Sequence, residues 1–215
     1  MGRRRDTGAA FLVSAGAAPM PDSPLPAVIV AGGLARRMGG GDKGLRPWGG
    51  GTVLSAIVAR LRPQAGPLAL NANGDPGRFA ALGLPVLADP VEGRPGPLAG
   101  LLAAMLWAEG LGADRVLTVP GDAPFLPSDL ARRLAAAGAP AIAASAGRTH
   151  PVAGLWPVEL AAPLRQDLAG GLRRVESFAR AQGANAVEFP VPRGGPDPFL
   201  NLNTPEDVAA ALRWL

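Results

Sequence analysis

Short apolar runs typical of buried strands alternate with segments of helical periodicity along the first part of the chain. The strand-like runs are PAVIVA (26–31), PLALNA (67–72), LPVLA (84–88) and RVLTVPGD (115–122). The helix-like segments that follow them span residues 52–61, 76–82, 97–110 and 127–138. Regular alternation of this kind favours a parallel sheet with helices packed against it. It therefore predicts an α/β fold with three layers and a doubly wound, mostly parallel sheet.

The second part of the chain has a less regular pattern. Strands are expected at 139–145, 150–156 and 186–189, and helices at 157–168, 172–182 and 204–215. Thr52 and Thr204 directly precede helical segments, and threonine in that position caps the first backbone N–H groups of a helix. The sequence contains no internal repeat, so we expect one domain over residues 25–215.

The first 24 residues imitate a signal peptide, because Arg3, Arg4 and Arg5 precede a run of small apolar residues. This apolar run is short and a strand pattern begins soon after it, so we expect a disordered N-terminal extension over residues 1–24 and no export. No apolar stretch approaches the roughly 20 residues that a membrane helix needs. We therefore expect a cytoplasmic protein that does not contact a membrane.

The composition excludes thiol chemistry and argues against nucleic acid as a partner. The sequence has no cysteine, which rules out disulfides, thiolate metal sites and a cysteine nucleophile. The net charge at pH 7 is only +4, and the arginines are scattered along the chain. A nucleic-acid-binding domain usually gathers its basic residues on one segment or face. We expect no nucleic acid partner.

A glycine-rich, basic segment directly follows the first predicted strand. Residues 28–45 read VIVAGGLARRMGGGDKGL and contain Lys43, the only lysine in the sequence. Ligands of open parallel sheets bind beyond the carboxyl ends of the strands, which is where this segment lies. Glycines let backbone N–H groups approach a triphosphate, and arginine and lysine neutralise the charge of a leaving pyrophosphate.

Two common phosphate-binding motifs fit this segment poorly. A Walker A loop has the glycine spacing at Gly39 and Gly44, but Leu45 and Arg46 stand where lysine and serine or threonine are required. A dinucleotide-binding fingerprint matches at Gly39, Gly41 and Gly44, several residues beyond the strand instead of immediately after it. The segment AGGLARRMGGGDK instead resembles the signature loop of nucleotidyltransferases similar to sugar-nucleotide pyrophosphorylases.

An acidic residue follows a later strand at the same predicted edge. Asp122 lies in PGDAP (120–124), and an acid at the carboxyl end of a strand can hold Mg²⁺ against a triphosphate. Capping of the next helix is the alternative role for this side chain. We expect Gly121, which precedes it, to tolerate substitution.

Glycine and asparagine motifs add further candidate contacts. GRPGPLAG (93–100) places glycines before a helix, where they would contact an anion or a pterin, or simply begin the helix. Four of the five asparagines form the pairs Asn71 with Asn73 and Asn201 with Asn203. Alternate residues on a strand point the same way, so each pair can present two amides to one ligand. Turn formation is the alternative for these asparagines.

Taken together, AGGxxRRMGGxDK, NAN, ADP (88–90), GPLAG, GDAP, HPV and NLNTPED resemble the molybdenum cofactor guanylyltransferase family. The resemblance runs from about Pro26 to Leu215 in matching order and spacing. It implies a Rossmann-like nucleotidyltransferase fold with a nucleotide-binding half over about 25–125 and an acceptor-binding half over about 126–215. The implied reaction transfers GMP from Mg²⁺-bound GTP to the terminal phosphate of molybdenum-molybdopterin. It releases pyrophosphate and forms the molybdopterin guanine dinucleotide cofactor.

The resemblance also implies roles for individual residues. GTP binding is expected at Val30, Ala31, Gly32, Lys43, Asn71, Asp89 and Asp122. The acceptor side is expected at Gly33, Gly40, Gly96, Gly100, Arg174, Asn201 and Asn203. Arg37, Lys43 and Asp122 are the expected catalytic residues, with Asp122 as the ligand of Mg²⁺.

The expected partners are GTP and a molybdopterin-type acceptor. Transient contacts with other proteins of molybdenum cofactor biosynthesis and with recipient molybdoenzymes are expected too, and we expect a monomer. His150 is the only histidine. A hydrogen-bonding, structural role is favoured for it over that of a general base, because a phosphate nucleophile is already ionised.

Two other functions remain open at this point. The first is a different nucleotidyltransferase, either a cytidylyltransferase that acts on molybdopterin or a sugar-phosphate nucleotidyltransferase, because the residues do not reveal base choice by physics alone. The second is a non-catalytic GTP-binding carrier of the cofactor. The presence of Lys43 and Asp122 favours an enzyme over a carrier.

Overall fold

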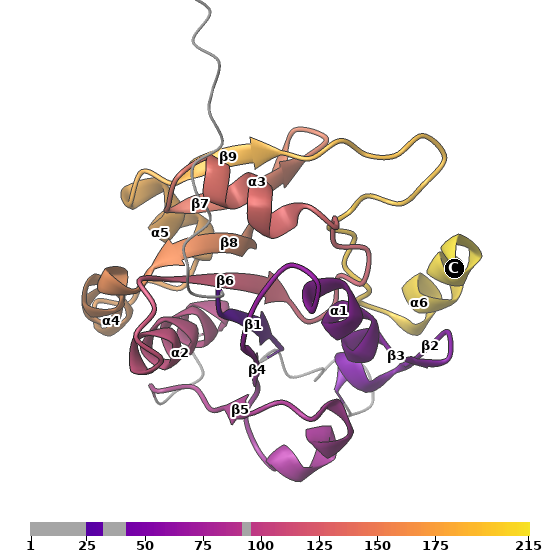
Figure 1. Cartoon of the computed structure of the whole chain (residues 1–215), viewed down its shortest axis with the longest axis horizontal. Coiled ribbons are helices and arrows are strands. Elements are labelled where there is room, and N and C mark those ends of the chain that lie inside the picture. Colours follow the sequence, from indigo (N-terminus) through magenta and orange to yellow (C-terminus); the bar gives the residue numbers. More distant parts are fainter. Residues whose placement is uncertain (1–24, 32–41, 92–95) are drawn as a thin grey trace, which may run out of the picture.

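The computed structural model of the chain describes residues 25–31, 42–91 and 96–215 (Figure 1). The expectations for residues 1–24 and for Gly32, Gly33, Arg37 and Gly40 lie outside these described residues. One seven-stranded sheet runs in the order β5-β4-β1-β6-β8-β7-β9. Its strands are β1 (Ala27–Val30), β4 (Leu68–Asn71), β5 (Val86–Leu87), β6 (Arg115–Pro120), β7 (Ala141–Ser145), β8 (Arg148–Pro157) and β9 (Asn185–Glu188). A separate hairpin is formed by β2 (Pro47–Trp48) and β3 (Gly51–Thr52).

Helices cover both faces of this sheet, so the predicted three-layer α/β architecture is confirmed (Figure 1). The helices are α1 (Val53–Leu61), α2 (Pro97–Gly110), α3 (Leu130–Ala136), α4 (Ala161–Ala169), α5 (Val175–Ala181) and α6 (Pro205–Ala211). Short 3₁₀ helices span Lys43–Leu45, Pro76–Leu82, Val158–Leu160 and Leu212–Trp214. Among the described residues, no helix combines the length and the apolar character that crossing a membrane requires.

The core is divided by the sheet into two hydrophobic clusters. One contains buried side chains of α1, α3 and α6, and the other contains those of α2, α4 and α5. Strand β1 contributes side chains to both clusters, because side chains alternate between the two faces of a strand. Ala27 and Ile29 belong to the first cluster and Val28 to the second. Helix α2 is buried along most of its length, because it packs against the sheet and also against α4.

The strand directions bring several carboxyl ends to one edge of the sheet. Strands β1, β4, β5 and β6 are parallel neighbours, whereas β8 runs antiparallel to both β6 and β7. The reversal of chain direction between β7 and β8 takes place in the tight turn at Ala146 and Gly147, whose φ angles are 47° and 72°. A two-residue turn with both φ angles positive joins antiparallel strands and is too short for a parallel crossover.

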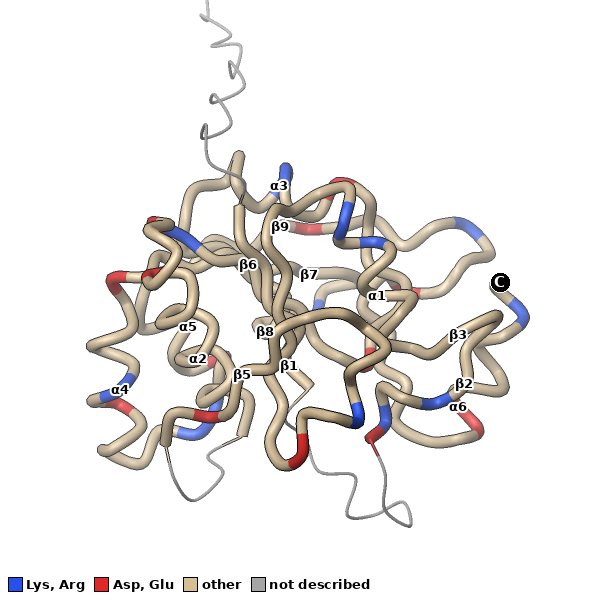
Figure 2. Tube along the Cα trace, turned by 60° about the horizontal axis from the view of Figure 1, so that its bottom comes forward, with Lys and Arg blue, Asp and Glu red and all other residues tan. Residues whose placement is uncertain are grey.

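Both predicted threonine caps are present. The side chains of Thr52 and Ser55 form a reciprocal capping box at the start of α1, and Thr204 and Asp207 form another at the start of α6. The positions of Lys and Arg are spread over several elements, including α3, α4 and the region of α6, as their scatter in the sequence indicates (Figure 2).

Candidate functional site

A cavity of about 270 Å³ lies where the carboxyl ends of β1, β4 and β6 meet. This is the edge of the sheet at which the sequence motifs predicted a ligand. The residues that the family resemblance assigned and that line this cavity are Val30, Ala31, Lys43, Asn71, Gly96, Asp122 and Asn201. They come from segments far apart in the sequence, and the fold brings them to one place.

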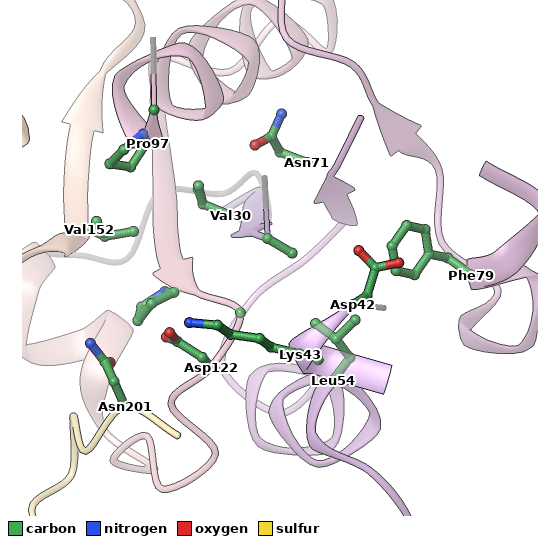
Figure 3. Close-up of a pocket in the computed structure, with 15 residues that line it drawn as sticks. Val30, Asp42, Lys43, Leu54, Asn71, Phe79, Pro97, Asp122, Val152 and Asn201 are labelled. Carbon is green, nitrogen blue, oxygen red and sulfur yellow. The ribbon is translucent and has the colours of Figure 1, made fainter. Parts of the chain in front are cut away.

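Lys43 and Asp122 form the charged part of the cavity. Figure 3 shows their side chains next to each other, with Asn201 beside Asp122 and with Asn71 and Val30 farther along the wall. Lys43 begins a short 3₁₀ helix at the end of the glycine-rich segment, and Asp122 follows the end of β6. A cation and a carboxylate side by side can bind a phosphate chain together with a metal ion.

The close approach of β1 and β6 depends on Gly121. Its N–H donates to the carbonyl oxygen of Val30 over 2.9 Å. A Cβ at position 121 would lie 2.8 Å from the Cβ of Ala31, closer than such atoms approach in real structures. The expectation that this position tolerates substitution is therefore wrong, because any side chain would separate the two strand ends that form the cavity.

Asp122 carries an electrostatic cost that a cation would relieve. Burial raises the pKa of the Asp122 carboxyl group, and the nearby Lys43 amino group and a backbone hydrogen bond lower it by smaller amounts. With its amide oriented to satisfy its hydrogen bonds, Asn201 donates to Asp122 Oδ1 over 3.3 Å. The raised pKa shows that these partners compensate the buried negative charge only in part.

The described residues contain no group of three or more His, Cys, Asp or Glu side chains that could hold a metal ion on its own. Mg²⁺ does not require one, since it commonly binds one or two carboxylates together with substrate phosphates and waters. The partly buried carboxylate of Asp122, which opens onto a cavity beside a lysine, fits such a shared site.

Lys43 and its neighbour Asp42 contact two distant parts of the chain. Its Nζ donates to Oδ1 of Asn203 over 2.9 Å, 160 positions later in the sequence. The preceding residue, Asp42, forms an ion pair with Arg78, which also donates to the carbonyl oxygen of Asn73 over 2.6 Å. Asn203, which the resemblance placed on the acceptor side, therefore lies against a residue placed on the nucleotide side.

The asparagines of the first pair meet on one carboxylate. Asn71 Nδ2 donates to Asp89 Oδ1 over 3.0 Å, and Asn73 Nδ2 donates to Asp89 Oδ2 over 2.7 Å. Asn71 is fully buried, and within the described part of the chain its Oδ1 has no hydrogen-bond partner. Buried polar atoms are nearly always paired in native proteins. Asn71 lines the cavity, and this buried oxygen lies in the cavity wall on the side of Gly100.

Gly100 lies directly behind Asn71, in the first turns of α2. A Cβ there would stand 2.3 Å from Oδ1 of Asn71 and 2.7 Å from Cγ1 of Val30. We expect Gly100→Ala to lower the free energy of unfolding by about 1–3 kcal/mol, as overpacking of a dense interior does. Gly110→Ala in the same helix is the matched control, because a Cβ at Gly110 meets no atom within 4 Å. Thermal unfolding of the two variants checks this, and equal stability of the two would contradict the packing described.

The other assigned residues that the structure describes lie outside the cavity lining. Asp89, Gly100 and Asn203 each contact a lining residue or pack directly behind one. Arg174 is exposed at the start of α5, and no lining residue of the cavity comes from its helix. The structure thus brings most of the described candidates together and leaves Arg174 apart.

Several lining residues were not among the residues to which a role in the site was assigned. Asp42, Gly44, Leu54 and Phe79 also face the cavity. Asp42 and Gly44 flank Lys43 within the glycine-rich segment, so the motif itself could have indicated them. Leu54 and Phe79 are ordinary apolar positions in a helix and a 3₁₀ helix, and nothing in their local sequence distinguishes them from core residues.

A smaller cavity of about 200 Å³ adjoins the first one and shares Pro120, Val152 and Asn201 with it. Arg148 and His150 of β8 also line it. Burial lowers the pKa of His150, Asp197 and Glu188 raise it, and Arg148 lowers it further. His150, for which the sequence favoured a structural role, thus lies in the wall of this adjoining cavity.

The family model of the MobA-like NTP transferase domain matches residues 27–185 of the chain. A molybdenum cofactor guanylyltransferase of Rhodopseudomonas palustris (strain BisB5) is 54% identical over 204 residues, which cover 91% of this chain and 96% of that protein. A molybdenum cofactor guanylyltransferase of Mesorhizobium japonicum is 52% identical over 196 residues, which cover 87% of this chain and 94% of that protein.

Solved structures share the fold at lower identity. The molybdopterin-guanine dinucleotide biosynthesis protein A of Archaeoglobus fulgidus is 20% identical with a TM-score of 0.65, over 88% of this chain and 97% of that one. A Mycobacterium tuberculosis protein in complex with manganese is 18% identical with a TM-score of 0.64, over 90% of this chain and 100% of that one. These likenesses confirm the nucleotidyltransferase fold.

Proposed function

The chain belongs to the family of MobA-like NTP transferases, and from that premise we propose that it is a molybdenum cofactor guanylyltransferase. It transfers GMP from Mg²⁺-bound GTP to the terminal phosphate of molybdenum-molybdopterin and releases pyrophosphate. The observation that carries the proposal is the proximity of Lys43 to the partly buried Asp122 in a cavity at the carboxyl edge of the parallel strands. The high identity to guanylyltransferases supports the choice of substrates.

The nucleotide occupies the part of the cavity formed by β1, β4 and the glycine-rich segment. Val30 and Ala31 end β1 there, and Asn71, at the end of β4, is a proposed contact of the nucleotide. Asp89, held by two asparagine amides, is the carboxylate available to N–H groups of the base. Gly32 and Arg37, which lie outside the described residues, belong to the same proposed subsite.

The chemical step places charge on the leaving pyrophosphate. Lys43 neutralises part of that charge, because its amino group reaches the cavity from the end of the glycine-rich segment. Asp122 is the residue that would hold Mg²⁺, and the bound ion supplies positive charge to the triphosphate. The carboxylate must be ionised for this role, and Lys43 favours the ionised form.

The acceptor occupies the adjoining smaller cavity and its rim. Arg148 supplies a cation for an anionic acceptor, and Asn201 lines both cavities beside Asp122. The acceptor phosphate is already ionised at neutral pH and attacks without a general base. Gly33, Gly40, Gly96 and Arg174 remain proposed contacts on this side, as does Asn203 through its bond to Lys43.

The organisation proposed for the chain is one domain over residues 25–215. Its nucleotide-binding half covers about 25–125 and its acceptor-binding half about 126–215. We propose a cytoplasmic monomer that contacts other proteins of molybdenum cofactor biosynthesis and recipient molybdoenzymes transiently. Nucleic acid and membranes are not among its proposed partners.

A panel of ATP, CTP, GTP and UTP, each with Mg²⁺ and molybdopterin, tests the function. We expect pyrophosphate release with GTP at a rate at least about 10²-fold above that with the other nucleotides, as for a site with hydrogen bonds to one base. Preference for CTP would instead identify a cytidylyltransferase. GTP binding without pyrophosphate release would identify a cofactor carrier, and either outcome overturns the proposal.

A further inference from the structure

The segment 197–203 connects the region after β9 to α6 and passes beside the charged part of the cavity. Its Leu202 N–H donates to the backbone oxygen of Asp122 over 2.8 Å. The next side chain, Asn203, accepts the hydrogen bond from Lys43 Nζ over 2.9 Å. The segment therefore contacts both residues on which the proposed reaction depends, one through its backbone and one through a side chain.

The other end of segment 197–203 is anchored on β7 and β8. Ser145 Oγ, fully buried at the end of β7, lies 2.8 Å from each carboxylate oxygen of Asp197. Asp197 Oδ1 also accepts a hydrogen bond from the N–H of Phe199 over 2.8 Å. The ring of Phe199 stacks on that of His150 with centroids 4.7 Å apart.

The number of protons available fixes which side chain donates in each of these hydrogen bonds. A serine hydroxyl has one proton, which Ser145 donates to the Asp197 carboxylate. His150 Nε2 lies 2.7 Å from the same hydroxyl oxygen and must therefore donate its own N–H to it. This assigns the ring proton of neutral His150 to Nε2. The three side chains form a directed chain of hydrogen bonds from His150 through Ser145 to Asp197.

We propose that Ser145, His150 and Asp197, here called the Ser145 cluster, are positioning residues for nucleotidyl transfer. They act through segment 197–203, which holds Asn201 and the Leu202 N–H against Asp122 and holds Asn203 against Lys43. The inference rests on the proposed function for its kinetic consequence. Ser145 and Asp197 lie outside the lining of both cavities, and His150 lines only the smaller one.

Ser145→Ala is the central test, since it removes the hydroxyl that joins His150 to Asp197. We expect kcat for pyrophosphate release to fall about 10-fold, because small misplacements at a reacting centre cost rate. The affinity for Mg²⁺-bound GTP should change less than about 3-fold, since the cluster lies away from the contacts of the base. Hydrogen exchange at the amides of Phe199 and Leu202 should become faster in the ligand-free variant.

Thr118→Val is the matched control for a buried hydroxyl of the same sheet. Thr118 is also fully buried and bonds to Val152 and Trp156, on the face covered by α2. The Thr118→Val variant is expected to have lower stability without faster hydrogen exchange at the amides of Phe199 and Leu202.

His150→Phe is the second variant, because it keeps an aromatic ring for stacking on Phe199 and removes the Nε2 donor to Ser145. It should show a smaller loss of kcat than Ser145→Ala.

A double-mutant cycle separates positioning from general destabilisation. If the Ser145 cluster acts through segment 197–203, the losses of kcat caused by Ser145→Ala and Asn203→Ala should be less than additive in the double variant. Additive losses in the cycle, or unchanged exchange at Phe199 and Leu202, would overturn the inference. If the wild-type protein releases no pyrophosphate from GTP, the proposed function fails, whereas the exchange measurements still decide whether the cluster holds the segment.

Discussion

Replacing Asp122 by alanine is expected to lower the rate of pyrophosphate release from GTP by at least about 10³-fold, the scale on which loss of metal and charge positioning acts. Asp122 is the carboxylate that lines the cavity at the end of β6, next to Lys43. Without it the protein loses the group that would hold Mg²⁺ on the triphosphate. Steady-state assays at saturating Mg²⁺ and GTP measure the effect.

The same substitution should not destabilise the protein at neutral pH. Burial raises the pKa of Asp122 above its ordinary value, so the folded state binds the proton more tightly than the unfolded state does. Ionisation of this group therefore opposes folding above the raised pKa and has no such effect below the ordinary value. In metal-free buffer at pH 7, Asp122→Ala should melt at or above the wild-type temperature. Asp114→Ala, at an exposed ion pair with Arg115, controls for loss of a carboxylate.

Wild-type turnover by Asp122→Ala would remove Asp122 from the mechanism. A loss of activity together with a large drop in melting temperature would show that the side chain is mainly structural. The Asp114 control should keep both its turnover and its melting temperature, because exposed ion pairs contribute little to stability.

Lys43→Ala is expected to lower kcat by roughly 10²–10³-fold, as loss of one preorganised contact to developing charge does. Its amino group faces the cavity beside Asp122, and the charge that it neutralises is greatest on the leaving pyrophosphate. Affinity for Mg²⁺-bound GTP should fall less than kcat. Arg132→Ala, at an exposed position paired with Asp129, removes a positive charge away from the site and should leave kcat unchanged. An effect of Lys43→Ala confined to GTP affinity would mean that the lysine only anchors the substrate.

The pH dependence gives a second measure of Lys43. The lysine lowers the pKa of Asp122 against the larger effect of burial, so its removal should raise that pKa further. Asp122 must be ionised to act, and kcat/KM reports ionisations of the free enzyme. The acid limb of the kcat/KM profile should therefore move to higher pH in Lys43→Ala. A limb that stays in place or moves to lower pH would show that another group limits activity.

Much of the local structure and part of the site could be predicted from the sequence, because they depend on neighbours in the chain. Apolar runs and helical spacing identified the strands of the parallel half of the sheet, and the two threonine caps were recognisable from the residues after them. The motifs around Lys43 and Asp122 follow strand ends, and parallel strands bring their carboxyl ends to one edge. The cavity at that edge was therefore predictable before any contact was known.

The tertiary structure alone decided which side chains touch, because those contacts join segments whose sequence separation carries no information about distance. Lys43 meets Asn203 across 160 positions, and Ser145 meets Asp197 through the pairing of β7 and β8 and the path of the chain after β9. The need for glycine at position 121 likewise arises only where β6 approaches β1. These are packing constraints between elements, and they exist only once the sheet order and strand directions bring the elements together.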